Sequence, residues 1–251
     1  MPAIRTEKLT KIYRRSHLGK VHTTVGIENV DLEIKKGEIF GLLGLNGSGK
    51  TTTIKLILGL LRPTKGGVFL LGEPAPSIKA LKQVGFLPET PYFYRYLTAL
   101  EILKFYGELS GVERVKDKAA QILDFVGLAE VGNKRLGEFS KGMLQRIGIA
   151  QSLIHDPGIL IYDEPVSGLD PLAMSEMRNL IMKLKSEGKT IFLSSHMISE
   201  VEKVCDRVGI LVKGELVKVL DQSEWNKSQG KLEAVFVDTV KDTAEFGRIK
   251  I

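Results

Sequence analysis

The chain has 251 residues, of which 43% are hydrophobic and 26% are charged, a composition typical of a globular protein with an apolar core. Its apolar runs are far shorter than the roughly 20 residues that a membrane-spanning helix needs, and no secretion signal opens the chain, so we expect a cytoplasmic protein. The net charge of +6 is dispersed, and no aromatic residues interleave with the basic ones, so we expect no nucleic-acid partner. The lone Cys205 excludes an internal disulfide and is expected to be a packed or surface thiol.

The first part of the chain has the pattern of antiparallel strands. Residues 4–13 and 27–35 are strand-like, and residues 30–34, Val-Asp-Leu-Glu-Ile, alternate between apolar and polar as a half-buried antiparallel strand requires. A short apolar strand is expected next, at residues 39–43. We therefore expect an amino-terminal antiparallel β-subdomain that leads into the main sheet.

Residues 44–52, Gly-Leu-Asn-Gly-Ser-Gly-Lys-Thr-Thr, form a complete phosphate-binding loop between that strand and a helix-like run at residues 52–60. The glycines let successive backbone N–H groups face inward, and the helix directs the positive end of its dipole at the same place. We expect Lys50 to reach the β- and γ-phosphates, Thr51 to ligate Mg²⁺ and Thr52 to touch the α-phosphate. The alternative is a glycine-rich turn that binds nothing. The nucleotide-binding residues expected in the loop are Gly44, Asn46, Gly47, Ser48, Gly49, Lys50, Thr51 and Thr52.

Beyond the loop, strand and helix patterns alternate. Strands are expected at residues 68–71, 84–88, 159–162, 190–193 and 208–212. Apolar residues at three- and four-residue intervals between positions 98 and 127 predict two or three amphipathic helices. A further helix is expected at residues 171–187, capped by Asp170 and ended at Gly188. The fold class is therefore α/β, a P-loop NTPase core with a mostly parallel sheet and an inserted helical subdomain.

The apolar strand at residues 159–162 ends in two adjacent carboxylates, Asp163 and Glu164. At the carboxyl end of a strand, Asp163 can hold Mg²⁺ through water, and Glu164 can polarise the water that attacks the γ-phosphorus. Taken alone, the pair could also be a solvated strand end. Combined with the phosphate loop, it indicates nucleotide hydrolysis.

At this point the chain resembles the ATP-binding cassette (ABC) family. Phe139-Ser140-Lys141-Gly142-Met143, which we call the signature segment, stands where that family carries its signature before the acidic pair. The family's other motifs follow in order: Tyr13 as an adenine-stacking aromatic, Ser167-Gly168-Leu169-Asp170 after the acidic pair, and His196 at the end of the next strand. The resemblance implies an ABC nucleotide-binding domain at residues 1–220, its helical subdomain at about 90–145, and a carboxyl-terminal extension at 221–251.

The resemblance also implies a mechanism. Two copies would face each other head to tail, and Ser140 and Gly142 of one would contact the γ-phosphate bound by Lys50 of the other. Ser140 can cap the helix that follows, which directs its positive end at that phosphate. His196 would contact the γ-phosphate or orient the attacking water beside the catalytic Glu164. Each single residue has a plainer alternative: a packed strand residue for Tyr13, a surface or core histidine for His196, and a simple helix start for Ser140.

Two positions depart from the family's pattern. Glu89 stands where the family usually has a glutamine, so the metal set of Thr51, Asp163 and Glu89 carries an extra negative charge, which puts metal affinity and turnover in doubt. The signature segment has Phe139, Lys141 and Met143 in place of commoner residues, but Ser140 and Gly142 remain, so we expect its function to survive.

The function that the resemblance implies is the ATP- and Mg²⁺-dependent subunit of a membrane transporter, more specifically an exporter. It would act as a homodimer on the cytoplasmic face of the membrane, through a separately encoded permease. The aromatic segment at residues 91–96 would meet that permease, unless it packs between the two subdomains. The alternative function is a soluble ABC ATPase that acts on a ribosome, DNA or a cluster-assembly scaffold. A GTPase or small-molecule kinase is a weaker alternative, because no aspartate follows Asn133-Lys134 to recognise guanine.

Overall fold

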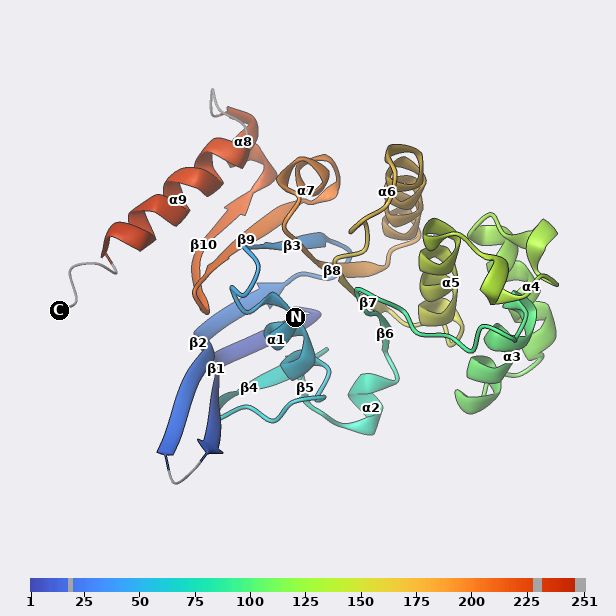
Figure 1. Cartoon of the computed structure of the whole chain (residues 1–251), viewed down its shortest axis with the longest axis horizontal. Coiled ribbons are helices and arrows are strands. Elements are labelled where there is room, and N and C mark those ends of the chain that lie inside the picture. Colours follow the sequence, from blue (N-terminus) through green and yellow to red (C-terminus); the bar gives the residue numbers. More distant parts are fainter. Residues whose placement is uncertain (18–19, 228–231, 247–251) are drawn as a thin grey trace. The chain divides into compact units, whose positions relative to one another are not determined.

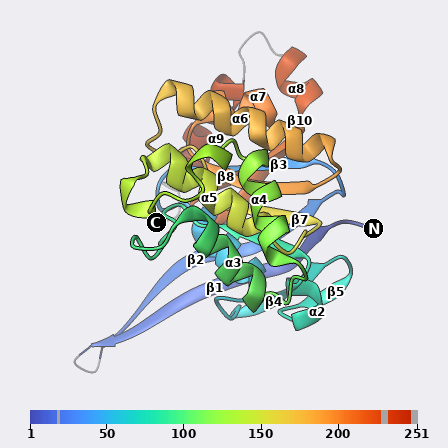
Figure 2. The ribbon, with the colours of Figure 1, turned by 90° about the vertical axis from the view of Figure 1, so that its right-hand side faces the viewer.

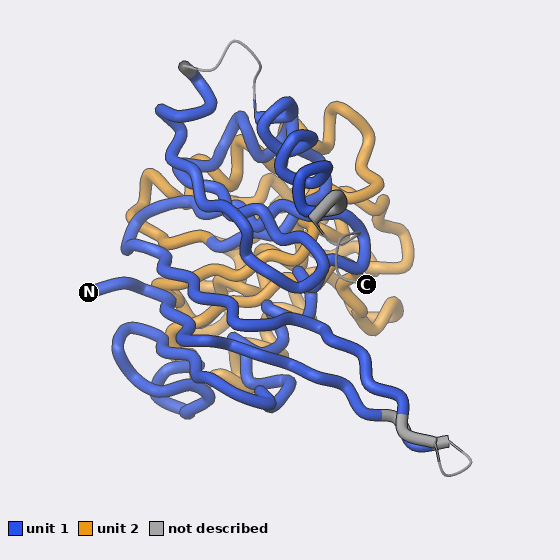
Figure 3. The backbone as a smooth tube through the Cα atoms, turned by 90° about the vertical axis from the view of Figure 1, so that its left-hand side faces the viewer, with its two compact units in different colours: residues 1–81, 192–251 blue, residues 82–191 orange. Residues whose placement is uncertain are grey.

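The computed structural model describes residues 1–17, 20–227 and 232–246, and the chain divides into two compact units (Figure 3). Unit 1 comprises Met1–Leu81 and Phe192–Ile251, and unit 2 comprises Lys82–Ile191. The chain thus leaves unit 1, builds unit 2 and returns to unit 1 through strand β8 (Thr190–Ser195). Figure 1 labels the helices and strands.

The first sheet of unit 1 is antiparallel, in the strand order β2-β1-β4-β5. Its strands are β1 (Ile4–His17), β2 (Lys20–Ile34), β4 (Lys65–Leu70) and β5 (Glu73–Ala75). In β2, Val30, Leu32 and Ile34 are buried whereas Asp31 and Glu33 are exposed, which confirms the predicted alternation. Strands β1 and β2 are longer than predicted and extend as a two-stranded ribbon beyond the rest of the sheet (Figure 2).

The second group of strands in unit 1 leads to the phosphate loop. Strand β3 (Ile39–Leu43) pairs in parallel with β9 (Arg207–Val212), which pairs antiparallel with β10 (Glu215–Asp221). All five residues of β3 are buried, as expected for a parallel strand covered on both faces. Helix α1 (Lys50–Ile57) begins and ends earlier than predicted. It ends early because Gly59, at a φ of 70°, adopts the left-handed conformation that terminates helices.

The remaining elements of unit 1 are short helices, α2 (Ile78–Leu81) and α7 (Ile198–Val204), and the two helices of the carboxyl-terminal segment, α8 (Gln222–Lys227) and α9 (Leu232–Phe246). Residues 232–237 form the start of α9. Cys205 follows the last residue of α7, and its thiol is buried, which agrees with the expected packed thiol.

Unit 2 contains a parallel strand pair and a group of helices. The strands are β6 (Val84–Leu87) and β7 (Ile159–Asp163). The helices are α3 (Ala99–Leu109), α4 (Val115–Phe125), α5 (Lys141–Leu153) and α6 (Pro171–Ser186), with 3₁₀ turns at Ala129–Val131 and Leu136–Glu138. Thr98 and Glu101 form a capping box at the start of α3, so the first of the predicted amphipathic helices has a well-defined beginning. The boundaries predicted for the helical subdomain stay a prediction.

None of the helices in the described part of the chain combines the length and the apolar character that crossing a bilayer requires.

Candidate nucleotide site

The phosphate loop lies between β3 and α1 in unit 1. Gly47 and Gly49 have φ values of 79° and 110°, which only glycine adopts without strain. The Lys50 side chain is buried, and its Nζ donates hydrogen bonds to the carbonyl oxygens of Gly44 at 2.8 Å and Leu45 at 3.4 Å. These bonds hold the ammonium across the mouth of the loop. The loop therefore presents a fixed positive charge next to the start of a helix, as an anion site requires.

Two glycines that the sequence analysis did not single out brace this loop. The N–H of Gly214, in the β9–β10 turn, donates to the carbonyl oxygen of Ser48 at 2.9 Å. A Cβ added to Gly49 would lie 2.6 Å from the carbonyl oxygen of Gly26, so the backbone at Gly26 and the loop are packed directly together. The available signal for Gly214 was its place after Lys213 between two strand-like runs, which predicts a hairpin turn.

Tyr13 lies close to the loop. Its hydroxyl group is 3.3 Å from the Oγ1 of Thr52, and a Cβ added to Gly26 would lie 2.6 Å from its ring. The Lys11 ammonium is 5.5 Å from the centre of the same ring. The structure therefore brings together Tyr13 and Thr52, two of the predicted nucleotide-binding residues. The role of Tyr13 in stacking on adenine stays a prediction.

The acidic pair lies in unit 2, at the carboxyl end of β7. Asp163 and Glu164 are 4% and 6% exposed, which excludes the alternative of a solvated strand end. Glu164 has a φ of 50°, a left-handed conformation that is uncommon for a residue with a side chain and that costs energy. Burial also raises the pKa of the preceding Tyr162. Two buried carboxyl groups at one strand end, one on a strained backbone, are typical of a reactive site rather than of a surface.

The signature segment lies at the start of α5, also in unit 2. Ser140 is the N-cap residue, and its Oγ accepts a hydrogen bond from the Met143 N–H at 3.2 Å, as predicted. A Cβ added to Gly142 would lie 3.1 Å from the Cβ of Ala173 in α6, and Asp170 caps α6 by accepting the Ala173 N–H at 2.9 Å. The amino-terminal ends of α5 and α6 therefore lie side by side. Two helix dipoles direct their positive ends at one region.

The Lys141 side chain of the signature segment lies against Gly168, in the segment after the acidic pair. Gly168 has a φ of 65°, a left-handed conformation in which a residue with a side chain would be strained. A side chain at this position would also displace the flexible end of Lys141.

His196 and Glu89 are both exposed, at the ends of strands in different units. His196 follows β8, where the N–H of Met197 donates to the Ser195 Oγ at 2.9 Å. Glu89 follows β6 by two positions. The predicted site is thus built as two halves: unit 1 holds Tyr13, the phosphate loop and His196, and unit 2 holds Glu89, Ser140, Gly142, Asp163 and Glu164. That both halves act on one nucleotide stays a prediction.

The residues predicted to hold Mg²⁺ fit the preferences of that ion. In the described residues, no three His, Cys, Asp or Glu side chains are grouped to hold a metal by themselves. Mg²⁺ in nucleotide sites usually keeps several waters and takes only one or two protein ligands besides phosphate oxygens. Thr51 at the start of α1 and the buried Asp163 offer such ligands.

The chain is similar to known proteins over most of its length. The profile of a family described as ABC transporter matches residues 27–167. An uncharacterized ABC transporter ATP-binding protein of Nostoc sp. is 46% identical over 220 residues, which cover 85% of this chain and 65% of that protein. The bacitracin transport ATP-binding protein BcrA of Bacillus licheniformis is 40% identical, over 91% of this chain and 72% of BcrA. The chain therefore spans less than two thirds of the Nostoc protein.

Solved structures show the same likeness. The ATP-binding subunit of an ABC transporter matches with a TM-score of 0.79 and 27% identity, over 94% of this chain and 99% of that one. A dimeric ATP-binding cassette in a post-hydrolysis state, bound to ADP and Pi, matches with a TM-score of 0.77 and 26% identity, over 87% of this chain and 98% of that one. These matches confirm the predicted fold class.

Proposed function

Because the chain belongs to the family of ABC transporter ATP-binding proteins, we propose that it binds and hydrolyses ATP to drive transport through a separate membrane permease. The observation that carries the nucleotide part of this proposal is the phosphate loop, with the Lys50 ammonium fixed across its mouth by the carbonyls of Gly44 and Leu45. A γ-phosphate would replace these carbonyls as the partner of the ammonium, which is a stronger, charge-assisted interaction.

The proposed hydrolytic roles follow from the chemistry of each side chain. Glu164, buried at the carboxyl end of β7, accepts a proton from the attacking water. His196 orients the same water or contacts the γ-phosphate. Mg²⁺, when bound, neutralises the negative charge that builds up on the β- and γ-phosphates. Thr51 and Asp163 hold it, and Glu89 adds a carboxylate where a neutral amide is the rule.

The second part of the proposal is a head-to-tail dimer closed by ATP. Ser140 is exposed, and the amino-terminal ends of α5 and α6 lie together. The first turn of neither helix has an acidic residue, although the Asp170 carboxylate caps α6. The positive end of the α5 dipole favours an anion beside Ser140. We propose that this anion is the γ-phosphate held by the loop of a second copy. The dimeric cassette among the similar structures supports this arrangement.

The third part concerns the permease. Tyr92, Tyr94 and Tyr96 are 88%, 51% and 68% exposed, whereas Phe93 is buried and anchors the segment. Three exposed tyrosines in five positions form an apolar surface with polar tips, which is typical of interface centres. We propose that the permease binds there and holds the protein at the cytoplasmic face of the membrane. The name of BcrA, a bacitracin transport protein, supports export as the direction.

Size-exclusion chromatography with light scattering tests the dimer, with wild type compared with Glu164→Gln in Mg²⁺ and ATP. We expect the variant to lose hydrolysis and to accumulate as a dimer, while wild type dimerises only briefly. Lys50→Met, which lacks the phosphate contact, is the matched control and should stay monomeric in the Glu164→Gln background. Hydrolysis that persists in Glu164→Gln would remove Glu164 as the base.

The aromatic surface separates this function from the soluble alternative. Replacing the three exposed tyrosines with serine should leave hydrolysis by the purified chain unchanged, because none of these three tyrosines belongs to either half of the site. It should abolish ATP-dependent transport in cells that express the chain with its permease. Transport that survives this change would favour another docking surface or a non-membrane partner.

A further inference from the structure

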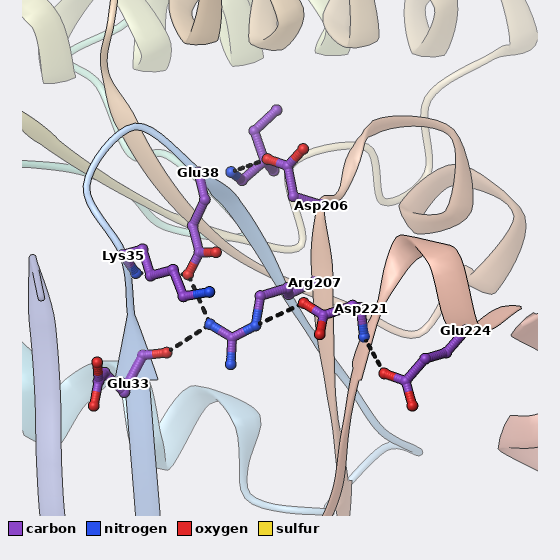
Figure 4. A network of polar contacts seen from close by, with 8 residues as sticks. Glu33, Lys35, Glu38, Asp206, Arg207, Asp221 and Glu224 are labelled. Atoms are coloured by element: carbon purple, nitrogen blue, oxygen red, sulfur yellow. Dashed lines mark hydrogen bonds and ion pairs between the residues drawn. The ribbon is translucent and has the colours of Figure 1, made fainter. Parts of the chain in front are cut away.

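The carboxyl-terminal segment is anchored to the strands that carry the phosphate loop. Arg207, the first residue of β9, donates from Nη1 to the Glu33 carbonyl and to Glu38 Oε1, both at 3.1 Å, and its Nε is 3.3 Å from Asp221 Oδ1 (Figure 4). The N–H of Asp221 then donates to the Glu224 carboxylate of α8 at 2.6 Å. One guanidinium therefore ties the turn before β3 to the end of β10 and the start of α8.

Both helices of the segment are packed onto unit 1. Trp225 of α8 is 1% exposed. Helix α9 packs against α7 and β9, and the N–H of its first residue, Leu232, donates to Glu202 Oε1 of α7 at 3.1 Å. Leu232 and Phe236 are buried one helical turn apart. Val240 is the next position on that face, since residues four apart in a helix lie one above the other.

Val240 faces the same pocket as the phosphate loop. It lines a pocket of about 260 Å³ together with residues 45–48 of the loop and with Leu211, Val212 and Lys213 at the end of β9. The walls are mainly apolar. The Lys213–Gly214 turn is itself joined to the loop by the bond from Gly214 N–H to the Ser48 carbonyl. Within the described residues the Ser48 Oγ is buried without a hydrogen-bond partner, so the Ser48 side chain itself does not tie the loop to its surroundings.

We propose that α9 is a positioning element of the phosphate loop and that Val240 is the residue through which it acts. The inference rests on nucleotide binding by the loop but not on dimerisation, hydrolysis or transport. The loop must hold its N–H groups toward the phosphate. The phosphate binds more tightly when the free loop has fewer alternative conformations. Docking of α9 restricts the loop on its outer side. Linkage is reciprocal, so nucleotide must also strengthen the docking of α9.

The first test measures the affinity for MgADP by isothermal titration calorimetry in full-length wild type, Val240→Ala, Val240→Ile and Val237→Ala. Val237 is 38% exposed on the same helix and is the matched control. We expect Val240→Ala to bind about 3- to 10-fold more weakly, Val240→Ile to restore the affinity, and Val237→Ala to match wild type. In steady-state assays Val240→Ala should raise KM for ATP by the same factor and leave kcat unchanged, which a general loss of stability would not do.

Hydrogen exchange provides the second test and the reciprocal readout. Amides of residues 232–246 and of the β9–β10 turn should become more protected when MgADP is added to wild type, and Val240→Ala should lose this response. Equal affinity in Val240→Ala and wild type, or an exchange rate of α9 that does not respond to MgADP, would overturn the proposal. Wild type that fails to bind MgADP would instead refute nucleotide binding itself.

Discussion

Removing the guanidinium of Arg207 should destabilise the carboxyl-terminal segment. The loss in the free energy of unfolding can be divided between the two ion pairs that the guanidinium makes. In the Arg207–Asp221 pair the carboxylate side chain is 62% exposed, and such pairs contribute about 0 to 1 kcal/mol. In the Arg207–Glu38 pair the side chains are 18% and 9% exposed, and breaking a buried pair costs about 3 to 5 kcal/mol. Glu38 keeps its bond from the Lys35 N–H at 2.6 Å, so we expect the lower end, about 3 kcal/mol, for Arg207→Met.

Urea unfolding followed by tryptophan fluorescence is a suitable assay, because Trp225 is the sole tryptophan of the chain and is buried in α8. Asp221→Asn should cost no more than about 1 kcal/mol. The double variant Arg207→Met/Glu38→Gln should lose about 1 to 2 kcal/mol less than the sum of the single variants, since it no longer leaves a buried charge without its partner. An Arg207→Met cost below about 1 kcal/mol, or additive single variants, would refute the division of energies given above.

Three further outcomes are expected. Lys50→Met should weaken MgATP binding at least about tenfold in calorimetry while the melting temperature stays near that of wild type, because the ammonium serves the phosphates more than the fold. Ser140→Asp should keep the N-cap of α5, whereas Ser140→Ala should lower the stability by about 1 kcal/mol because the cap is lost. Neither variant should form the ATP dimer in light scattering. A dimer of Ser140→Asp would contradict the proposed phosphate contact. Burial lowers the pKa of His155, whose Nε2 is 3.1 Å from the Val84 carbonyl, so the folded state excludes a proton that the unfolded state binds. Stability should therefore be full above the ordinary histidine pKa of about 6.5 and fall as the pH drops below it; thermal melts at decreasing pH should show a shallower fall in His155→Gln.

The parts of the structure that could be predicted from sequence are those that depend on near neighbours. Ser140 and Asp170 cap helices as predicted because each accepts an N–H only three positions away. The phosphate loop was recognisable because its glycines, Lys50 and Thr51 follow one another. The acidic pair was recognisable because an apolar strand directly precedes it, but its burial was not predicted.

The parts that could not be predicted depend on residues far apart in the chain. Leu232 is capped by Glu202, thirty positions earlier, and Ile39 donates to Asp206, 167 positions later. No local pattern marks such a partner. For the same reason the carboxyl-terminal segment looked like a weakly patterned extension, although Trp225 and Phe236 pack it into the unit that carries the loop. The bond from Gly214 to Ser48 was hidden because any hairpin turn can contain a glycine.

The pairing of β3 with β9 has a consequence for the newly made chain. Phe40 pairs with Arg207 and Leu43 with Ile210, so the edge of β3 that β9 covers waits for about 170 residues before β9 emerges from the ribosome. At about 5 to 20 residues per second, the interval is on the order of 10 to 30 s. During this time five consecutive apolar residues offer an unpaired edge to any other unfinished chain nearby. The architecture thus leaves one edge of the strand that feeds the phosphate loop uncovered until late in synthesis.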